Sequence, residues 1–424
     1  MSQTLVSTAP VQIGLQPFSR PSLPAEEHTV RIPQSSSNDL IKAALNEGIK
    51  KGQKIDETVA SIMDILEKFS LQQYGNDVFM GRKVFGPKVH LHVSEHRKLP
   101  MVLPAFPAKS INTQDKVLGT SPDLGEELAL DRLNDLCTQI SRVYEPGAMI
   151  LIATDGACYN GVTEDSLWEY GVTLRKMVAE KGYDCIKFVR IMNLLGLHTD
   201  EQISKEDFVH LLEPSRRIMM TRYGDSEFDA NWYIQNDPDY KSTYDGYSKF
   251  LKKDLAFSPF RQNAASGKKW KALVHNTAKA MIARGVAFAA LIRERYPDYV
   301  RLSIHPSTGL TKISMPMIPQ PDSFSMTPWH CAVAVDVNGK FKTAHAGVLR
   351  ETHDLVLKGG VPYCFRERSS LYSWDAKVEF THLYGGGMIV RNVGGNSKEP
   401  LSDADQEKLA KLRSLQGNVT LEGF

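Results

Sequence analysis

The sequence predicts an α/β fold, a Rossmann-like mixed sheet flanked by helices. Residues 148–153 form an apolar run, which is typical of a strand buried on both faces of a parallel sheet. A helical pattern follows over residues 167–177, and residues 185–189 then have the composition of a second strand. This order is the βαβ unit of an α/β sheet, whose ligands bind beyond the carboxyl ends of the strands.

The N-terminal third is predicted to be a leader followed by a helical part. Residues 1–37 are rich in Ser, Pro and Gln and are expected to form a disordered leader. Residues 38–98 form the helical N-terminal part, since apolar residues recur every three or four positions over 55–69. Within it, the alternation over residues 88–93 predicts a strand, and the prolines of residues 100–107 indicate an extended connection.

Two more helical regions follow in the middle of the chain. Ser121 as N-cap, Pro122 at the first helical position and Asp123 in the first turn predict the start of a helix. Residues 200–266, rich in Tyr, Asp and Lys, are expected to form a helical insertion or a lid. The apolar stripe over residues 271–295 predicts a long helix packed on the core.

The C-terminal third begins with a predicted hairpin. Residues 331–336 and 340–343 flank Asn338-Gly339, a strong signal for a tight turn between antiparallel strands. Residues 393–424 mix Gly, Ser, Lys and Glu and are expected to form a mobile or helical C-terminal tail.

Composition limits the classes of partner. Lys and Arg total 51, and Asp and Glu total 49. The chain therefore lacks the excess of basic residues that would predict binding to nucleic acid. No apolar run approaches the ~18 residues of a membrane span. The five cysteines form no C-x-x-C pair, which argues against a disulfide framework or a zinc knuckle. We therefore expect a soluble, cytoplasmic protein that acts on a small molecule.

The segment 300–305 gives the first candidate site. Read as a strand, it places Arg301, Ser303 and His305 on one face, because strand side chains alternate. Burying such groups without partners costs about 1–3 kcal/mol each, so an ordinary core strand gains nothing from them. We interpret this face as the wall of an active site; the alternative is a solvated outer face.

Three further positions could bring reactive groups to the same wall. Lys109 and Ser110 follow Pro107 on a stiffened loop, and Asp155 ends the buried strand 148–153. His330 lies just before a predicted strand. The competing interpretations are a surface lysine, ordinary Asp-Gly turn chemistry and a structural histidine.

The segment 365–369 is a candidate anion site. If it is extended, Arg366 and Arg368 project to one side, and paired guanidinium groups suit bidentate binding of phosphate or carboxylate. A surface ion-pair run that includes Glu367 is the alternative. His90, His92 and His96 have a spacing suited to a metal, but their charged neighbours favour a solvated segment, so no metal is expected. The P-loop and dinucleotide glycine motifs are absent.

Several segments, in order from about residue 40 to about residue 392, resemble one family. The segments include Lys109-Ser110 and residues 116–119, 154–156, 301–307, 327–330 and 365–369. Together they closely resemble the isocyanide (isonitrile) synthase family, of the pyoverdine/dityrosine biosynthesis type. The resemblance is to a fungal-style, single-domain member, with residues 38–392 as its catalytic domain.

The resemblance implies a reaction of secondary metabolism. The α-amine of an L-amino acid condenses with the C2 ketone of ribulose 5-phosphate, and that carbon becomes the terminal carbon of the isonitrile. Proton removal, loss of phosphate and carbon–carbon cleavage complete the reaction, as in a lyase or transferase. No metal or organic cofactor is implied, and separate enzymes are expected to modify the product. Members of the family use different amino acids, including tyrosine, tryptophan and valine.

Taken with this resemblance, the patterns assign roles to ten residues. The catalytic residues are expected to be Lys109, Asp155, His305 and His330. The substrate- and phosphate-binding residues are expected to be Ser110, Arg301, Ser303, Arg366, Glu367 and Arg368. The histidines would transfer protons, since an imidazole pKa lies at about 6.5, and Asp155 would hold the substrate ammonium.

Two alternatives belong to other classes of protein. One is an aldolase in which Lys109 forms a Schiff base with a sugar phosphate. The other is a non-catalytic module that binds a sugar phosphate without converting it.

Overall fold

The computed structural model describes most of the chain between residues 34 and 368 and three strands beyond it. The residues left undescribed within that span are 71–78, 157–163, 201, 265, 306, 308, 320–325, 337–340 and 359–360. The chain forms two compact units, Met1–Gly52 and Gln53–Phe424, and the candidate site belongs to the second. None of the described helices combines the length and the apolar character needed to cross a bilayer.

A five-stranded sheet in which all paired strands are parallel forms the centre of the second unit. Its strands, in spatial order, are β3 (Ile186–Arg190), β2 (Ala148–Thr154), β1 (Leu99–Ala105), β4 (Val300–Ser303) and β5 (Ile313–Ser314). The chain moves outward from β1 to β2 and β3, then returns to place β4 on the other side of β1. The order therefore reverses between β1 and β4, and open α/β sheets bind ligands at such a switch point.

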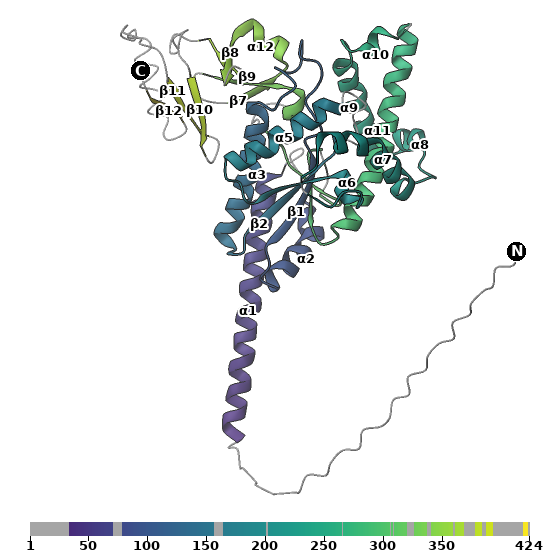
Figure 1. Cartoon of the computed structure of the whole chain (residues 1–424). Coiled ribbons are helices and arrows are strands. Elements are labelled where there is room, and N and C mark those ends of the chain that lie inside the picture. The colour runs from purple at the N-terminus through teal and green to yellow at the C-terminus, as the bar shows by residue number, and fades with distance from the viewer. Residues whose placement is uncertain are drawn as a thin grey trace, which may run out of the picture. The chain divides into compact units, whose positions relative to one another are not determined.

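Helices cover both faces of this sheet (Figure 1). Four helices share one hydrophobic core with the face that carries Met101 and Leu103: α1 (Gln34–Phe69, from Gln53 onward), α2 (Gly81–Ser94), α3 (Leu124–Val143) and α5 (Glu164–Glu180). Three helices pack on the face that carries Val102 and Ala153: α6 (Ile191–Leu194), α7 (Lys205–Tyr223) and α11 (Gly267–Arg295). The α/β class with a helix-flanked sheet is thus confirmed.

The region predicted as a helical insertion consists of helices. After α7 come α8 (Ala230–Asn236), α9 (Pro238–Asp254) and α10 (Pro259–Gln262). α9 packs against α11 through Tyr247 and Leu251, which share a small core with residues of α11. This packing fixes the end of α9, where Asp254 lies.

Two smaller sheets form the C-terminal part. The four-stranded sheet has the order β7 (Phe341–Ala344), β6 (Ala332–Val335), β9 (Val361–Glu367) and β8 (His353–Lys358). The short helix η1 (Pro328–His330) leads into β6, and α12 (Ala346–Thr352) follows β7. The predicted hairpin is confirmed, since β6 and β7 pair antiparallel, although its turn lies outside the described residues.

The third sheet consists of β10 (Val378–Leu383), β11 (Gly387–Asn392) and β12 (Val419–Glu422). β12 pairs parallel to β11, so the last described part of the predicted mobile or helical tail is a strand. At the other end of the chain, α1 begins at Gln34, inside the segment predicted as leader. Residues 1–33 and most of residues 393–424 lie outside the described part of the chain.

The strand predicted over residues 88–93 is wrong, because this segment lies in α2. A helical period also fits this part of the chain. It begins at Phe85 and buries Val89 and His92 on the same face of the helix. Leu91, which the alternation placed inside, is 37% exposed. His90 is exposed whereas His92 is buried, so the two histidines do not share a metal-binding face.

The extended connection predicted over residues 100–107 is instead mostly the central strand β1. Proline has no backbone N–H to donate. Pro100 and Pro104 lie four residues apart, so both missing donors face the same neighbouring strand, and the hydrogen bonds of β1 to the strand on its other side are uninterrupted. The predicted cap of α3 is also corrected: Asp123, not Ser121, is the N-cap. Its carboxylate accepts the N–H of Gly125 at 2.8 Å, and its own N–H donates to Glu126 at 3.0 Å.

Candidate active site

A polar cluster lies beyond the carboxyl end of β1, at the switch point of the central sheet. It is built from the loop that follows β1, the last residue of α9 and the last residue of η1. Lys116, Asp254 and His330 are its centre, and they come from positions more than 70 residues apart. Only the fold brings these three groups together.

The three central groups contact one another. Lys116 Nζ donates to Asp254 Oδ1, and it lies 3.2 Å from Nδ1 of His330. Burial, together with the neighbouring Lys116 ammonium, lowers the pKa of His330 to about 3. His330 is therefore a neutral imidazole at physiological pH. We assign the ring hydrogen to Nε2, because an ammonium group can only donate and Lys116 Nζ, at 3.2 Å, is nearer to Nδ1 of His330 than Asp254 Oδ2 is, at 3.5 Å.

Ser110 ties the β1 loop to the same carboxylate. Its hydroxyl donates to Asp254 Oδ1 at 2.8 Å, and its N–H donates to the carbonyl oxygen of Trp329 at 2.9 Å. The side chain of Asn112 also donates to the carbonyl of Lys253 at 2.8 Å. These bonds hold the loop, the end of α9 and η1 in one arrangement.

More cationic groups lie at the edge of the cluster. Nζ of Lys253, an exposed residue, lies 3.2 Å from Nδ1 of His345, the residue just before α12. The first residue of α12, Ala346, donates its N–H to the carbonyl of Lys116 at 3.1 Å. Lys116 contacts the Asp254 carboxylate and Lys253 precedes Asp254 in the chain, and the neighbouring positive charges of the two lysines favour an anionic ligand at this edge.

An aromatic bridge connects this cluster to His305. The ring of Phe250 lies 4.9 Å from that of His330, Tyr247 lies 5.5 Å from Phe250, and His305 lies 6.3 Å from Tyr247, measured between ring centroids. His305 follows the end of β4 and is exposed. The two predicted histidines therefore lie on either side of the rings of α9.

The other two residues of the predicted wall lie within β4. Ser303 is buried, and its hydroxyl accepts the N–H of His305 at 3.1 Å. Arg301 is partly buried and donates to the carbonyl of Leu302 at 3.2 Å. Ser303 therefore orients the backbone that carries His305.

Lys109 has a different environment from the one expected for a catalytic base. Its side chain is completely buried, and its Nζ lies 2.8 Å from both Asp123 Oδ2 and Glu126 Oε2. It also donates to the carbonyl of Pro328 at 3.0 Å. Burial would lower the pKa of Lys109, but the two carboxylates raise it above its ordinary value. Lys109 is a permanent cation that fastens the β1 loop to α3 and η1.

Asp155 lies at the carboxyl end of β2, as predicted. It is 7% exposed, and its Oδ1 atom accepts no hydrogen bond from the described part of the chain. Burial raises the pKa of Asp155 to about 7, although its own backbone N–H and the nearby Arg301 oppose this shift. Gly156 is required next to it, since a Cβ there would lie 1.9 Å from the carbonyl oxygen of Pro107. Asp155 thus changes its charge near neutral pH, as a proton-transfer group needs to.

Asp155→Asn is expected to stabilise the protein increasingly as pH rises. The raised pKa means that the native state holds a proton between about pH 4 and 7 which the unfolded state has lost, so wild-type stability falls over this range. Asp155→Asn has no such pH dependence, so its free energy of unfolding relative to wild type should increase by up to ~1.4 kcal/mol per pH unit over this range. Urea unfolding at pH 5, 6, 7 and 8 measures it, with exposed Asp245→Asn as control. Parallel curves for wild type and Asp155→Asn would contradict the buried acid.

The predicted arginine pair is divided between two environments. Arg366 lies in β9, 7% exposed, opposite Val335 of β6 and Asp354 of β8. Glu367 ends that strand. Arg368 follows it and is exposed, and its side chain donates to Asp354 at 3.1 Å and to the carbonyl of Glu351 at 3.1 Å. Arg368 thus takes part in the surface ion pair that was the alternative interpretation.

Two central residues, Lys116 and Asp254, were not among the predicted site residues. Lys116 lies in one of the segments that resemble the family, but nothing about its immediate neighbours distinguishes it from a surface lysine. Asp254 follows Lys252 and Lys253 at a helix end, a pattern typical of a solvated turn. No local signal identifies them, because their role depends on contacts between distant segments.

The fold and the cluster define a class of protein. A doubly wound α/β sheet carries buried, mutually bonded ionisable groups at its switch point, which is the usual place for the ligand site of an α/β protein.

The chain belongs to the pyoverdine/dityrosine biosynthesis protein family, whose profile matches residues 89–356. It is 39% identical to isocyanide synthase xanB of Aspergillus fumigatus, over 93% of this chain and 58% of that protein. It is 34% identical to L-tryptophan isonitrile synthase AmbI2 of Fischerella ambigua, over 70% of this chain and 84% of that protein. The crystal structure of PvcA from Pseudomonas aeruginosa aligns with a TM-score of 0.65 and 25% identity, covering 73% of this chain and all of PvcA. The predicted family is thereby confirmed.

Proposed function

We propose that this protein is an isocyanide synthase that converts the α-amine of an L-amino acid to an isonitrile, with ribulose 5-phosphate as carbon donor. The observation that carries the proposal is the Lys116–Asp254–His330 cluster at the switch point, in a chain of this family. The cluster offers cations for a phosphate and a neutral donor for a ketone, the two functional groups of a ketose phosphate.

The phosphate is bound by the lysines of the cluster. Lys116 is buried and Lys253 is exposed, so together they extend from the interior of the site to its edge. Each charge-assisted hydrogen bond to phosphate contributes roughly 1.5–3 kcal/mol, and it also stabilises the departing phosphate dianion. Exposed Arg368, already paired with Asp354, is not needed for this role.

His330 polarises the C2 ketone. Its lowered pKa keeps the imidazole neutral, and the bond from Lys116 to Nδ1 leaves the Nε2 hydrogen to donate to the ketone oxygen. A neutral imidazole matches the weak acidity of the alcohol or enol that forms better than an imidazolium would. Attack by the amine on C2, with loss of water, then gives the imine.

Asp155 accepts a proton from the substrate ammonium, which must be neutral before it attacks. A carboxyl group with a pKa of about 7 is half ionised at working pH, which is the best compromise for a base. Later proton removals, phosphate loss and cleavage of both the C1–C2 and the C2–C3 bond complete the isonitrile, because its terminal carbon keeps a bond to nitrogen alone. We assign the second proton-transfer role to His305, on the other side of Tyr247.

The direct test is to incubate the purified chain with ribulose 5-phosphate and each of a panel of L-amino acids. We expect a product with the mass and the infrared absorption of an isonitrile, and with its terminal carbon labelled when C2 of the sugar is ¹³C. Added EDTA should leave the rate unchanged, since every proposed step uses side chains alone. Absence of isonitrile with all amino acids would refute the proposal, and inactivation by EDTA would refute its metal-independent form.

One observation favours a second candidate, an aldolase-type mechanism with a different lysine from the predicted one. Burial lowers the pKa of Lys116, which Asp254 opposes, and a lysine with lowered pKa can form a Schiff base with a ketose phosphate. Borohydride in the presence of ribulose 5-phosphate would then label Lys116. The imine we propose forms on the substrate amine and leaves the protein unlabelled.

A further inference from the structure

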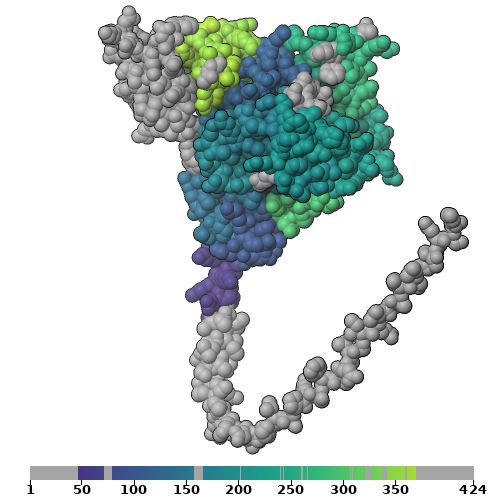
Figure 2. All heavy atoms as spheres, viewed as in Figure 1, coloured from purple at the N-terminus to yellow at the C-terminus, as the bar shows by residue number. Residues whose placement is uncertain are grey.

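The turn formed by residues 113–116 carries Lys116 into the polar cluster. This turn lies at the surface, since Gln114 and Asp115 are exposed, whereas Lys116 is only 2% exposed. Figure 2 shows the blue surface of this part of the chain between the yellow-green surface around α12 and the green surface of the helices that include α11. A short surface segment thus places a buried cation of the candidate site.

Keeping Lys116 inside the protein is costly. Burial lowers the pKa of Lys116, and the contact with Asp254 opposes this shift without cancelling it. The charged form is therefore disfavoured inside the protein and would be better hydrated if the turn moved outward. The turn needs contacts of its own to keep Lys116 beside Asp254 and His330.

The first two residues of α12 hold one half of the turn. Ala346 donates its N–H to the carbonyl of Lys116 at 3.1 Å, and Gly347 donates its N–H to the carbonyl of Asp115 at 2.9 Å. Both donors are backbone groups at the start of α12, which have no partner within the helix itself. The turn therefore satisfies the helix, and the helix in return fixes the backbone of Lys116.

The side chain of Arg350, one turn further along α12, holds the other half. Its Nη1 donates to the carbonyl of Gln114, and its Nη2 donates to the carbonyl of Thr113 at 2.8 Å. One planar guanidinium group thus bridges two successive carbonyls, an arrangement that the single ammonium of a lysine does not reproduce. Bonds from a charged donor are also stronger than those between neutral groups. All four carbonyls of residues 113–116 therefore accept hydrogen bonds from α12.

The packing of α12 makes it a firm support for the turn. Ala346 and Leu349 are buried in a small core with Ala334 of β6 and Phe365 of β9. Leu118, which follows the turn, belongs to the same core. The position of Lys116 is thereby coupled to the four-stranded sheet.

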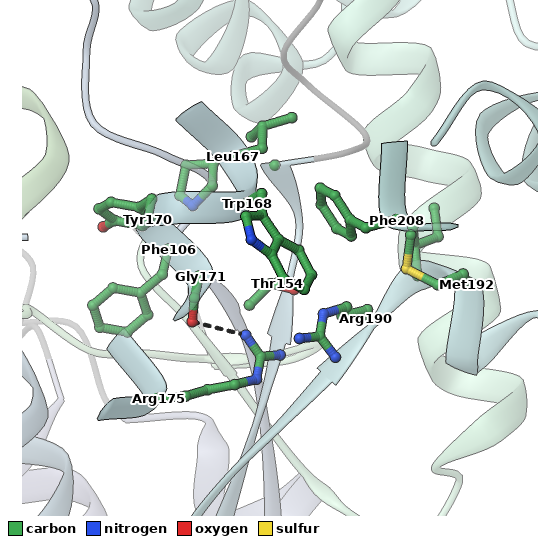
Figure 3. A pocket seen from close by; sticks show the side chains of 13 residues that line it. Phe106, Thr154, Leu167, Trp168, Tyr170, Gly171, Arg175, Arg190, Met192 and Phe208 are labelled. Carbon is green, nitrogen blue, oxygen red and sulfur yellow. Dashed lines mark hydrogen bonds between the residues drawn. The ribbon is translucent and has the colours of Figure 1, made fainter. Parts of the chain in front are cut away.

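The pocket at the carboxyl ends of β2 and β3 is not an alternative place for the phosphate (Figure 3). Its Trp168 and Phe208 rings are already in contact, with centroids 5.4 Å apart. Arg175 donates to a backbone carbonyl at 3.0 Å, and the guanidinium of Arg190 lies 5.8 Å from the Trp168 ring centroid. The phosphate therefore stays at the polar cluster, where the placement of Lys116 matters.

We propose that Arg350 is a positioning residue for the proposed reaction: it holds the turn of residues 113–116 so that Lys116 reaches His330 and the phosphate of the sugar. Arg350 does not touch the substrate and acts through Lys116. The inference rests on the proposed function and adds to it a residue of α12, outside the polar cluster. The competing role for Arg350 is a purely structural one, since a cation in the last turn of a helix interacts favourably with the helix dipole.

The first test compares the two substrates in Arg350→Met, which removes both side-chain bonds to the turn. We expect KM for ribulose 5-phosphate to rise about 10-fold, because the phosphate contact of Lys116 is weakened, while KM for the amino acid stays within about 2-fold of wild type. Arg350→Lys keeps the charge without the planar fork and should lie between wild type and Arg350→Met. Steady-state rates of isonitrile formation, with each substrate varied in turn, measure both constants.

Matched controls and a double-mutant cycle separate positioning from a structural role. Val348→Ala changes a residue of α12 that is 62% exposed, and Arg222→Met changes an exposed arginine of α7; both should leave KM unchanged. Lys116→Met alone should raise KM for ribulose 5-phosphate, and adding Arg350→Met to it should change KM by less than about 2-fold, because Arg350 acts through Lys116. Effects that multiply in the double variant would show that Arg350 acts elsewhere and would overturn the inference.

Chemical labelling reports the position of Lys116 without any substrate. The buried ammonium of Lys116 should react slowly with sulfosuccinimidyl acetate in the wild-type protein, and about 10-fold faster in Arg350→Met, because the turn opens more often. Mass spectrometry of peptides measures the rate at each lysine. Buried Lys109 and exposed Lys249 are internal references whose rates should not change. This measurement decides even if Lys116→Met does not fold.

The outcomes distinguish this inference from the proposed function. If Arg350→Met forms isonitrile with wild-type KM values and Lys116 is labelled at the wild-type rate, the positioning role is overturned while the reaction stands. A lower melting temperature of Arg350→Met without either change would likewise leave only the structural role. If no isonitrile forms with the wild-type protein but Arg350→Met still accelerates the labelling of Lys116, the proposed reaction fails and the hold of Arg350 on Lys116 stands.

Discussion

His330→Ala is expected to lower kcat about 100- to 1,000-fold, the cost of removing one preorganised donor to a developing oxyanion. The variant loses the Nε2 hydrogen that we place on the ketone oxygen and leaves Lys116 and Asp254 paired with each other. The effect should fall on kcat more than on KM for ribulose 5-phosphate, because the phosphate contacts come from lysines. Steady-state rates of isonitrile formation measure it.

A conservative variant and a pH profile test the neutral form of His330. His330→Gln keeps a donor near the Nε2 position and should recover part of the lost rate. Because the pKa of His330 is lowered to about 3 and that of Asp155 is raised to about 7, the titration of the wild-type rate near neutral pH should come from Asp155 and should persist in His330→Gln. His275→Ala, which removes a partly exposed histidine bonded to Tyr244, is the control and should be active. Wild-type turnover by His330→Ala would remove His330 from the mechanism.

Lys109→Met is expected to destabilise the protein by about 3–5 kcal/mol, the cost of leaving a buried charge without its partner. Two carboxylates, Asp123 and Glu126, would lie 2% exposed or less with no cation beside them. The free energy of unfolding in urea measures the loss. Lys249→Met, at an exposed position of α9, is the control and should stay within about 0.5 kcal/mol of wild type.

A combined variant shows whether the loss comes from the buried charges. Lys109→Met with Asp123→Asn and Glu126→Gln removes all three charges and should recover part of the stability, because no unpaired ion remains. The same variants distinguish structure from catalysis. Two results together would show that our structural role for Lys109 is wrong and that the aldolase with Lys109 as nucleophile is correct. Lys109→Met would fold with wild-type stability and lose all activity, and borohydride would label Lys109 in the wild-type protein.

Local patterns were sufficient for most elements of the fold. The apolar run of β2 and the stripe of α11 each repeat one period over a long stretch, so the neighbouring residues determine the element. The short segment 88–93 satisfies both the strand and the helix period, and the prolines of β1 disguise a central strand as a connection. In these two places, contacts with distant segments decide whether the residues form a helix or a strand. Such contacts cannot be inferred from neighbouring residues.

The candidate site likewise contains residues that local sequence patterns could identify and residues that they could not. Positions at strand ends, such as Asp155 and His305, could be proposed from sequence because βα topology places them on one edge. Lys109 could be recognised as important, but not as a buried cation, because its two carboxylates lie 14 and 17 residues away and reach it only through the start of α3. Arg366 and Arg368 share a pattern, yet one is buried and the other is paired at the surface.

The sequence by itself determined the α/β class, the family and the strand ends at which reactive groups gather, since periodicity and local motifs are properties of neighbouring residues. Only the tertiary structure decided which of those groups contact one another. Lys116, Asp254 and His330 are separated by 138 and 76 residues along the chain, and their charges and pKa values follow from burial and from partners that only folding supplies. Ionisation depends on the three-dimensional surroundings of a group, which no local stretch of sequence contains.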